Sequence, residues 1–550
     1  MNRQRNVRNL TAIGGATAAI ALLTGFPGAR ADELADLRAN QQLLQQRIDQ
    51  LAQAQGQQPP APGGVSGGGP GSAYGTRPIA GQFVAGGSFP RSFLIPGTDT
   101  SIRVGGFIDL TGPYYIQGAN SGNPGTPSSN TGQNGNLNTV PIGEQFIPGA
   151  PNGGIVPQQA NHSRGNGVFY FTPQQSRINI ETRTPTAWGE SRTFLEFDWA
   201  GCNNFSCQSL QQGGGDSLLP RLRFAYGTLG GFLAGQAISN FSDSDADSES
   251  VSFGGAMGGT GGMRIPQARY TLAIPYGGAL SFSAEQPFTP LMTPGGLLSS
   301  DTNVNALPSG PGTGTIPAIC NGVPCAGAGG SVNNPARTIA PDLTVASYWA
   351  EPWGHVDFAG LIKPMDVNDG RFISEKFIGY GGHFSGNVKT NCCGLSPKDG
   401  FTFSFIGGEG MGNYMSGGWS NAVGLATNFT VPTSCATPTT GCTGGMAASN
   451  VIFKPVFGYS ANGSYQHWWL PNLRTNIAAG VAEQDMSSQL IGPASSSSAT
   501  KQQWNAFVNL IWNPVPFITT GIEYMYGKRV TVGNGTGQEQ VINAKWRVAF

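Results

Sequence analysis

Hydrophobic and polar residues alternate over the end of the chain, residues 537–550. The apolar face of this stretch consists of Ile542, Ala544, Trp546, Val548 and Phe550. The other face is mostly polar and consists of Val541, Asn543, Lys545, Arg547 and Ala549. A period of two predicts a β-strand with one apolar and one polar face. A transmembrane β-barrel is built from such strands, because lipid covers its outside and water fills its inside.

The same alternation recurs from about Ser101 onward in short segments separated by turns. In four of these segments the apolar face consists of Ile102, Val104, Ile108 and Leu110; Leu195, Phe197 and Trp199; Leu222, Phe224 and Tyr226; and Trp504, Ala506, Val508, Leu510 and Trp512. The opposite faces consist of Arg103, Phe107, Asp109 and Thr111; Arg192, Glu196 and Asp198; Arg221 and Arg223; and Asn505 and Asn509. We therefore predict an all-β protein, an antiparallel transmembrane β-barrel with its polar faces turned inward.

Tight turns alternate with long polar connections between these segments. The tight turns contain Gly or Pro and lie at 184–186, 229–231, 275–278, 352–354 and 514–516. The long connections cover about 117–166, 201–216, 242–263, 289–340, 412–449 and 486–500. Outer-membrane barrels have short periplasmic turns and long external loops. The pattern predicts about sixteen strands, with both barrel ends on the periplasmic side, although the 390–400 connection is long for a periplasmic turn.

The composition favours a membrane barrel over several soluble domains. Charged residues make up 11% of the chain, against about 25% in typical soluble domains. Hydrophobic residues make up an ordinary 39%, as expected when alternation hides a lipid-facing surface. Without four arginines of an N-terminal signal, the 30 basic residues become 26 against 30 acidic ones, a formal charge of −4. No clustered basic patch indicates a nucleic-acid partner.

The N-terminal region predicts three further segments. Residues 1–31 have the basic start, apolar core and Ala-Arg-Ala cleavage site of a secretory signal peptide. Residues 32–55 predict a short helix with a coiled-coil seam, which we expect to associate with copies of itself or to lie on another surface. Residues 56–91 form a Pro/Gly/Ser-rich linker, and the barrel follows over residues 92–550.

The eight cysteines form four local pairs in stretches that we predict to be loops. Candidate disulfides join Cys202 to Cys207, Cys320 to Cys325, and Cys435 to Cys442. Such spacing in an exported protein indicates disulfides that fix loops. The adjacent Cys392 and Cys393 could form a strained vicinal disulfide or pair with another loop. Zinc is the alternative, but no pair of histidines lies nearby, and we expect no metal there.

Residues Ser92 to Phe107, with the sequence SFLIPGTDTSIRVGGF, resemble the entry to the first strand of DcaP-like trimeric outer-membrane porins. Residues 235–254 are similar to the segment that leads into the inward-folded loop of that family. The order of signal peptide, coiled-coil helix, linker and barrel is similar too, and a last Phe resembles the insertion signal of outer-membrane barrels. The resemblance implies a Gram-negative outer-membrane homotrimer of sixteen-stranded barrels with a periplasmic coiled coil. It also implies passage of small anionic solutes such as dicarboxylates.

Extending the inward register through the first six predicted strands gives a set of candidate pore-lining arginines. The set consists of Arg103, Arg177, Arg183, Arg192, Arg221, Arg223 and Arg269. Asp109, Glu181, Glu196 and Asp198 face the same way, so the lining is mixed. Guanidinium groups stay charged and bind carboxylates in a bidentate fashion, so this wall would favour anions. The alternative is that the arginines only pair with neighbouring carboxylates and stiffen the barrel.

Asp243, Asp245, Asp247 and Glu249 alternate in the connection after the predicted fifth strand. Porins commonly fold a loop at this point into the barrel. Acidic residues on such a loop, facing arginines on the wall, would set a transverse field across a narrow opening. A Ca²⁺ site is a second interpretation, although the Gly and distal Glu of an EF-hand loop are missing. An exposed acidic loop tip is the third.

The sequence predicts an outer-membrane porin for passive diffusion of small hydrophilic solutes, with an anion preference. We expect no catalytic residues, because the four histidines are scattered and no nucleophile elbow or phosphate-binding loop is present. Two alternatives remain open at this stage: a barrel hydrolase, and a structural barrel tethered by its coiled coil. Conductance in a planar bilayer would separate a pore from both.

Overall fold

The computed structural model describes residues 86–117, 167–169, 171–199, 220–252, 255–258, 263–275, 277–294, 296–298, 319–320, 323–324, 336–337, 339–368, 374–390, 398–415, 423–428, 451–534 and 536–550. The predicted signal peptide, coiled-coil helix and nearly all of the linker lie outside these ranges, as do the side chains of all candidate disulfide cysteines. No helix within the described ranges is both long and apolar enough to cross a membrane.

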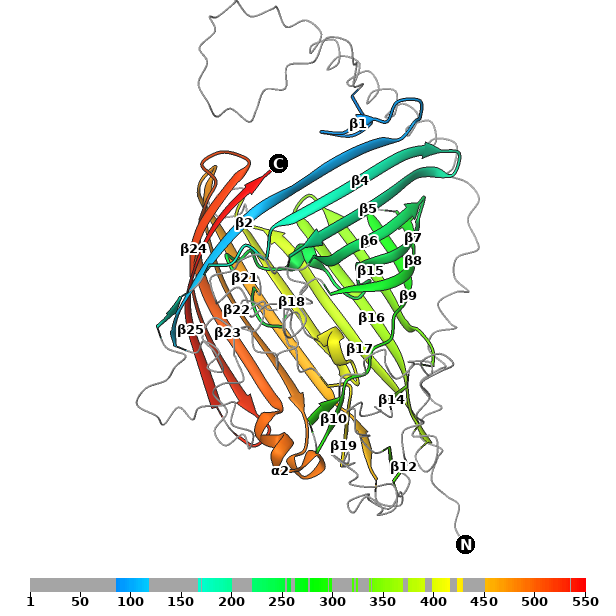
Figure 1. The fold of residues 1–550 in the computed structure, drawn as a ribbon, viewed down its shortest axis with the longest axis vertical. Helices are drawn as coiled ribbons and strands as arrows, with labels where there is room; N and C mark the ends of the chain where they lie inside the picture. The colour runs from blue at the N-terminus through cyan, green and yellow to red at the C-terminus, as the bar shows by residue number, and fades with distance from the viewer. Residues whose placement is uncertain are drawn as a thin grey trace, which may run out of the picture. The chain divides into compact units, whose positions relative to one another are not determined.

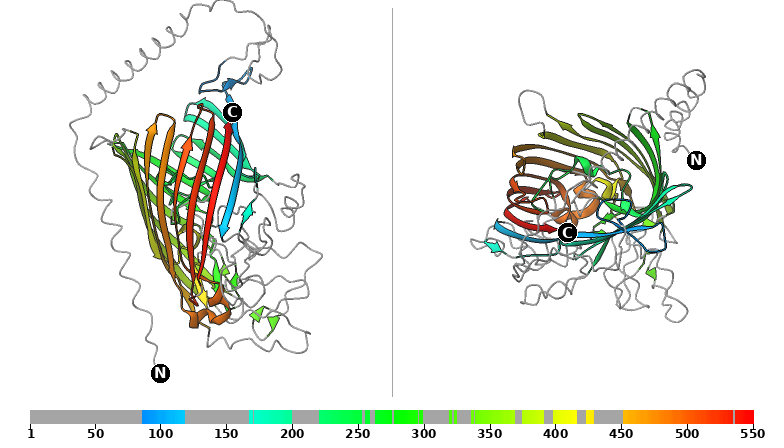
Figure 2. Two further views of the ribbon diagram at one scale, coloured as in Figure 1. Left: turned by 90° about the vertical axis from the view of Figure 1, so that its left-hand side faces the viewer. Right: turned by 90° about the horizontal axis from the view of Figure 1, so that it is seen from above.

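Sixteen antiparallel strands form a closed ring, seen from the side in Figure 1 and from above in Figure 2. In ring order the strands are β2 (Ser101–Gln117), β4 (Arg177–Thr186), β5 (Gly189–Asp198), β6 (Arg221–Leu229), β7 (Phe232–Ile238), β8 (Arg264–Ile274), β9 (Gly278–Glu285), β15 (Asp342–Glu351), β16 (Gly354–Asn368), β17 (Ser374–Lys389), β18 (Gly400–Glu409), β21 (Phe457–Leu470), β22 (Leu473–Asp485), β23 (Thr500–Trp512), β24 (Ile518–Thr531) and β25 (Thr536–Ala549). The predicted fold class and strand number are confirmed.

Pairing between β2 and β25 closes the ring and uses the last residue of the chain. Ala549 lies opposite Phe107 in this pairing. The backbone N–H of Phe550 donates to the carbonyl of Gly106 at 3.0 Å, and the N–H of Gly106 donates back at 3.3 Å. Gly106 has a φ of +155°, and a Cβ atom there would lie 2.1 Å from the carbonyl oxygen of Arg177. Only glycine therefore fits where the first and last strands meet.

Apolar and polar side chains alternate across the barrel wall as the sequence predicts. On β23, Val508 is 44% exposed on the outside, whereas its neighbour Asn509 is 3% exposed on the inside. On β25, Trp546 is outward and Asn543 is buried. On β2, Ile108 is exposed and Asp109 is buried. This polarity, apolar outside and polar inside, is the reverse of that of a soluble barrel and suits a surrounding of lipid.

The predicted orientation of Phe224 and Tyr226 is wrong. The pairing of β5 with β6 shifts register between Glu196 and Phe197, so Leu222 lies opposite Phe197 on the outer face. Beyond the shift, Phe224 pairs with Glu196 on the inner face. Tyr226 pairs with Phe194, and their rings are 5.7 Å apart. The extra residue of a β-bulge reverses the side-chain alternation, and a strict period of two cannot show it.

Four of the five predicted tight turns lie between consecutive strands at one end of the barrel. The turn predicted at 184–186 is instead the end of β4, and the turn to β5 consists of residues 187–188. The turn after β6, for example, consists of the two glycines between Leu229 and Phe232. Gly230 there adopts a positive φ of 58°. The 390–400 connection between β17 and β18 lies at this same end, as predicted, and is the longest of these turns.

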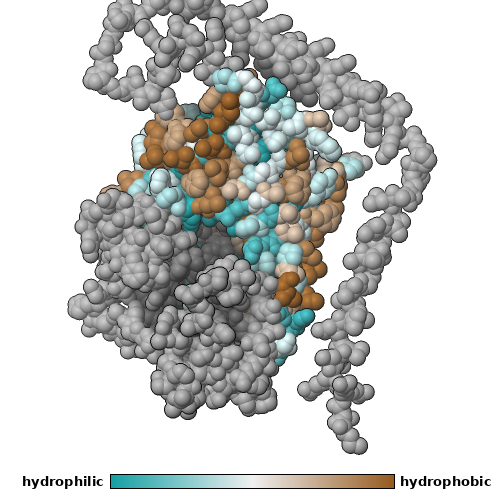
Figure 3. Space-filling view, turned by 45° about the vertical axis from the view of Figure 1, so that its right-hand side comes forward, coloured by the Kyte–Doolittle hydropathy of each residue, from teal (hydrophilic) through white to brown (hydrophobic). Residues whose placement is uncertain are grey.

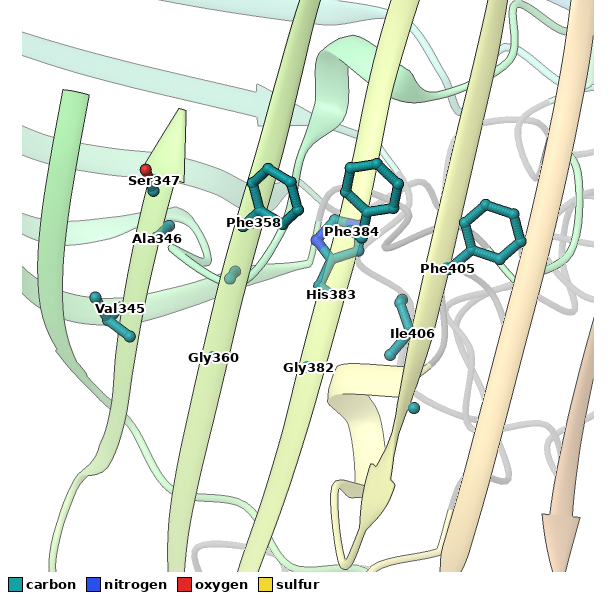
Figure 4. A pocket seen from close by; sticks show the side chains of 12 residues that line it. Val345, Ala346, Ser347, Phe358, Gly360, Gly382, His383, Phe384, Phe405 and Ile406 are labelled. Atoms are coloured by element: carbon teal, nitrogen blue, oxygen red, sulfur yellow. The ribbon is translucent and has the colours of Figure 1, made fainter. Parts of the chain in front are cut away.

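The outer face is apolar and carries rows of aromatic rings. Phe358, Phe384 and Phe405 lie side by side on β16, β17 and β18 (Figure 4), with Phe358 and Phe384 stacked at 4.7 Å. Glycines 360, 382 and 407 form the next row and leave a shallow apolar groove of roughly 650 Å³ beside the rings. Hydrophobic patches are visible on the barrel surface in Figure 3. Lipid is the expected surrounding of such a face.

The end of the barrel opposite the tight turns carries most of the remaining elements. They are the edge strands β3 (Val168–Phe169) and β14 (Ala336–Arg337), the small sheet of β10 (Leu291–Thr293), β11 (Gly296–Leu298), β19 (Leu425–Thr427) and β20 (Phe453–Pro455), the hairpin β12 (Ile319–Cys320) and β13 (Val323–Pro324), and helix α2 (Ser488–Ser498). The 3₁₀ helix η7 (Gly412–Met415) follows β18 and folds inward, where Tyr414 and Met415 are buried together with Phe241. Leu291, Leu425 and Phe453 are buried together with Met365 and Val367 of β16. The small sheet is thus packed onto the barrel wall. A short strand β1 (Phe93–Leu94) precedes β2 and pairs with its start.

Candidate pore and constriction loop

The connection between β7 and β8 folds into the ring instead of extending away from it. It begins at Ser239 and ends at Met263, where the N–H of Ser239 donates to the carbonyl of Met263 at 2.8 Å. Between these residues it contacts the inner faces of β15–β17 and then of β21–β24. We call residues 239–263 the constriction loop. Its position after the fifth barrel strand is where the sequence predicts it.

Asp243 joins the start of the constriction loop to the far wall. Its Oδ2 lies 2.8 Å from Nε2 of His355 on β16 and accepts a hydrogen bond of 2.7 Å from Ser385 on β17. Burial alone would raise the pKa of Asp243, but the hydrogen bonds from His355 and Ser385 outweigh it and lower the pKa. Asp243 is therefore an ionised anchor, not a free charge in the opening.

Asp245 and Asp247 are the two exposed acids of the constriction loop. Asp245 is the middle residue of the short 3₁₀ helix η5 (Ser244–Ala246), and Asp247 follows the end of this helix. Asp243 caps its first turn. Asp245 accepts a weak hydrogen bond of 3.4 Å from Tyr348 on β15. The surface of Asp247 is open to the inside of the barrel, but protein atoms lie around it on most sides. The resulting desolvation, together with the charges of Asp243 and Asp245, raises the pKa of Asp247 to about 7.

Glu249 anchors the loop to another part of the wall. It forms a bidentate ion pair with Arg474 on β22, in which Nε of Arg474 donates at 2.6 Å. Gln466 on β21 donates to the same carboxylate at 2.8 Å. The sequence prediction did not include Arg474, because nothing in the linear pattern connects it with a loop 225 residues earlier. Arg474 lies two residues after the Pro-Asn turn, and this position predicts that it lies near the start of a strand but not which residue it binds.

The end of the constriction loop approaches the wall closely at Asn505 and Gly480. The N–H of Met257 donates to Oδ1 of Asn505 on β23 at 2.7 Å, and Asn505 donates back to the carbonyl of Gly255 at 3.0 Å. A Cβ atom at Gly480 on β22 would lie 1.8 Å from the carbonyl oxygen of Met257. Glycine at 480 therefore allows the backbone of the loop to approach the strand closely.

Six of the seven predicted arginines form a ladder on the inner faces of β2, β4, β5 and β6, where they share four carboxylates. One of these, the half-exposed Glu190, lies 3.5 Å from Arg183. Glu181 is buried and binds Arg103 at 2.5 Å, Arg192 at 2.7 Å and Arg183 at 2.8 Å. The three guanidinium groups remain partly exposed, with side-chain exposures of 25%, 32% and 31%. One carboxylate thus holds three cations, and their surplus charge faces the interior of the barrel.

The second half of the arginine ladder is more deeply buried. Arg223 bridges Glu196 and Asp198, at 2.8 Å from each, and is only 5% exposed. Arg221 binds Asp198 at 2.6 Å, and Arg177 lies 3.5 Å from Glu196. Pairing with carboxylates, the structural alternative stated for these arginines, therefore occurs, yet six guanidinium groups share four carboxylates.

Arg269, the seventh predicted arginine, lies on β8 outside the ladder and forms no ion pair with a described residue. Arg264, at the start of the same strand, was missed by the sequence prediction because it falls out of the alternating register. Its charge interacts with Arg177, Arg221 and Arg223, so it lies close to the ladder. Arg264 adds a further cation to this side of the barrel.

The arginine ladder and the loop acids lie on different halves of the ring. The ladder occupies the first four strands in ring order, whereas Asp243 contacts β16 and β17, the ninth and tenth. Glu249 contacts β21 and β22, the twelfth and thirteenth. The ladder thus lies on one half of the ring and the two anchoring acids on the other, where each is paired with a basic group of the wall.

The Ca²⁺ interpretation finds no donor cluster in the described part of the chain. Among these residues, no three His, Cys, Asp or Glu side chains converge in a way that would hold a metal ion. Asp243 and Glu249 turn away from each other to bind His355 and Arg474. Their oxygens are therefore used by the protein itself.

A comparison of the sequence with protein families gives one match. Residues 150–279 match the DcaP outer membrane protein family, in agreement with the resemblance seen in the sequence. The matched range includes the arginine ladder from Arg177 to Arg223 and the whole constriction loop. Among curated proteins, none matches the chain.

One solved structure has the same fold. The outer membrane channel DcaP of Acinetobacter baumannii superposes with a TM-score of 0.56 at 18% identity, over 85% of this chain and 100% of that one. An anion-selective porin from Comamonas acidovorans has a TM-score of 0.42 at 7% identity, over 82% and 100% of the two chains. The first of these supports the sixteen-stranded barrel fold.

Proposed function

We propose that this outer-membrane channel of the DcaP family is a porin that favours small anions as they pass through the barrel by diffusion. Its family is one of channels and not of enzymes, so the hydrolase alternative is set aside. The anion preference is our inference from the lining, as is a preference for small carboxylates and dicarboxylates. We also propose the homotrimer that the sequence resemblance implies.

The observation that supports the anion preference is the ratio of arginines to carboxylates in the ladder. Glu181 alone holds Arg103, Arg183 and Arg192, whose exposed edges face the interior. Across the whole ladder, six guanidinium groups share four carboxylates, those of Glu181, Glu190, Glu196 and Asp198, a surplus of two positive charges. A pore selects by width and by the charge that lines it, so this surplus lowers the barrier for anions.

The constriction loop would also orient a solute as it passes. Asp245 and Asp247 present exposed carboxyl groups on the far side of the barrel from the ladder. A solute with a negative end and a neutral or positive end would turn its negative end toward the arginines. A small dicarboxylate would be bound at two points along the ladder, since each guanidinium group can bind one carboxylate in a bidentate fashion.

Reversal potential in a salt gradient tests the proposal. We expect the purified protein in a planar bilayer to conduct in steps. In a potassium chloride gradient, the sign of its reversal potential should show that chloride permeates more readily than potassium. Replacement of both Arg183 and Arg192 by Gln should shift the potential toward the cation side, because the variant loses two charges and leaves Arg103 to pair with Glu181. A cation preference in the unmodified protein would overturn the proposal.

A second double variant distinguishes arginines that select ions from arginines that only stiffen the wall. Arg221 and Arg223 hold Asp198 with little exposure. An unchanged reversal potential after replacement of both would assign these two arginines to stiffening of the wall. The exposed arginines around Glu181 would then carry the selectivity alone.

A further inference from the structure

The far end of the constriction loop is bound by one buried carboxylate of the barrel wall, that of Glu523 on β24. The side chain is turned inward and the residue is 1% exposed. Its two oxygens accept hydrogen bonds from three consecutive loop residues. Ser250 donates from its hydroxyl at 2.8 and 3.0 Å, Val251 from its backbone N–H at 2.8 Å, and Ser252 from its backbone N–H at 3.2 Å.

Glu523 is itself held in place by wall residues. Asn509 on β23 donates to Oε2 at 3.0 Å through its side-chain amide, and the same amide donates to the carbonyl of Glu249 at 2.9 Å. Asn543 on β25 lies 3.5 Å from Oε1. The carboxylate is therefore oriented by wall residues as well as by the loop, and Asn509 binds both the wall carboxylate and the loop.

This contact differs in kind from the other two anchors. Asp243 and Glu249 are loop side chains that bind the wall, and a change at either leaves the loop backbone bound elsewhere. Glu523 is a wall side chain that binds two backbone N–H groups of the loop. Hydrogen bonds from two adjacent N–H groups to one carboxylate are strong, because the acceptor is charged. The acceptor belongs to the wall, so these two bonds depend on Glu523 and not on the side chains of the loop.

We propose that Glu523 is the positioning residue that fixes the far end of the constriction loop, and so sets the largest solute that passes. Without it, residues 250–252 lose their acceptor on β24, and the segment between the Glu249 anchor and the Met257 contact is free to move. The opening between the loop and the arginine ladder then has no fixed width. This inference rests on the channel activity but not on the proposed anion preference.

The direct test is hydrogen exchange at the loop backbone, which needs no conduction. Glu523→Ala should speed exchange of the amides of Val251 and Ser252 by about 10- to 100-fold, the loss expected for hydrogen bonds to a charged acceptor. Glu523→Gln retains one acceptor oxygen and should give an intermediate rate. The matched control is Glu483→Gln on β22, where the carboxylate binds Tyr459 and Gln502 away from the loop. The control should leave both amides protected.

The functional test is the size limit in proteoliposomes. Swelling rates for neutral saccharides of one to four units, each divided by the monosaccharide rate, measure this limit without influence of charge. We expect Glu523→Ala to raise the relative rates of the larger saccharides and to leave the monosaccharide rate nearly unchanged, and Glu483→Gln to match the original protein. A folded Glu523→Ala variant with unchanged exchange and an unchanged size limit would overturn the proposal.

Ser250→Ala provides a second variant in case loss of Glu523 prevents folding. It removes both hydroxyl hydrogen bonds to Glu523 and leaves the wall intact. We expect a smaller rise in amide exchange at Val251 and Ser252 and a smaller rise in the size limit. If the barrel conducts anions poorly but these variants still change exchange and size limit, the anion preference fails and the positioning role stands.

Discussion

Nε2 of His355 lies 2.8 Å from Oδ2 of Asp243, so a residue of β16 holds the start of a loop that leaves the barrel wall at β7. The two residues are 112 positions apart in the chain. Because Asp243 is ionised, Nε2 carries the proton and donates it. Ser385 on β17 donates to the same oxygen, so two strands share one loop carboxylate.

Asp243→Asn should destabilise this anchor. An amide cannot accept both donors as strongly as a carboxylate, and hydrogen bonds to charged groups contribute about 1.5–3 kcal/mol. The pKa of Asp243 is lowered in the folded protein. Its contribution to stability is therefore complete above the ordinary carboxyl pKa of about 3.9 and is lost as pH falls through the lowered value.

Thermal unfolding in detergent, followed from neutral pH downward, measures this contribution. We expect the original protein to be more stable than Asp243→Asn near neutral pH, and the difference to narrow below about pH 4. Single-channel recordings should show more frequent current fluctuations in the variant. Equal stability of the two proteins at neutral pH would contradict an anchoring role for Asp243.

Asp247 should make ion selectivity depend on pH near neutrality. Its pKa is raised to about 7, so the group is largely protonated at pH 6 and largely ionised at pH 8. Raising the pH adds negative charge to the loop, and the ratio of chloride to potassium permeability should fall. Reversal potentials at pH 6 and pH 8 measure the change, and Asp247→Asn should remove most of it. The idea fails if that variant keeps the full dependence on pH.

Arg192→Gln and Arg223→Gln each remove one positive charge, but we expect them to change the stability of the protein by different amounts. Arg192→Gln leaves Arg103 and Arg183 to pair with Glu181, so we expect little loss of stability. Arg223→Gln removes the bridge between Glu196 and Asp198, and breaking a buried ion pair costs up to about 3–5 kcal/mol.

Unfolding in urea measures the free energy of each variant, and reversal potential measures its charge effect. We expect a similar shift of the reversal potential toward cations in both variants, with a clear loss of unfolding free energy only for Arg223→Gln. A large and equal loss in both variants would show that the exposed arginines around Glu181 are structural as well.

The sequence allowed the barrel, its strand number and the position of the constriction loop to be predicted, because each depends on local pattern. Lipid and water impose alternation on every strand, and turn residues mark where strands end. The orientation of Phe224 and Tyr226 was wrong because a bulge between Glu196 and Phe197 shifts the register. One inserted residue reverses the alternation without changing the composition.

The partners of the loop acids could not be predicted for a different reason. Glu249 binds Arg474 and residues 250–252 bind Glu523, at separations of more than 200 positions. Which residues meet depends on the curvature of the ring and on how far the loop reaches inside it. Asp243, Asp245, Asp247 and Glu249 look alike in the sequence, yet two of them are anchors and two are exposed.

Gly480→Ala should displace the end of the constriction loop. An added Cβ atom would lie 1.8 Å from the carbonyl oxygen of Met257 and 2.7 Å from its carbonyl carbon. Neither atom can yield without movement of the loop backbone, so the hydrogen bond from Met257 to Asn505 should be lost. We expect altered conductance and faster amide exchange at Met257, with the barrel itself intact.

Gly463→Ala on the neighbouring strand β21 is the matched control for this substitution. An added Cβ atom there would meet its nearest neighbours, Phe401 and Thr402, at 3.5 and 3.6 Å, which are ordinary contacts. Conductance and exchange should therefore stay at the level of the original protein. If Gly480→Ala also leaves the conductance and the amide exchange unchanged, the loop does not approach β22 at Gly480. The opening would then be wider than the hydrogen bond between Met257 and Asn505 implies.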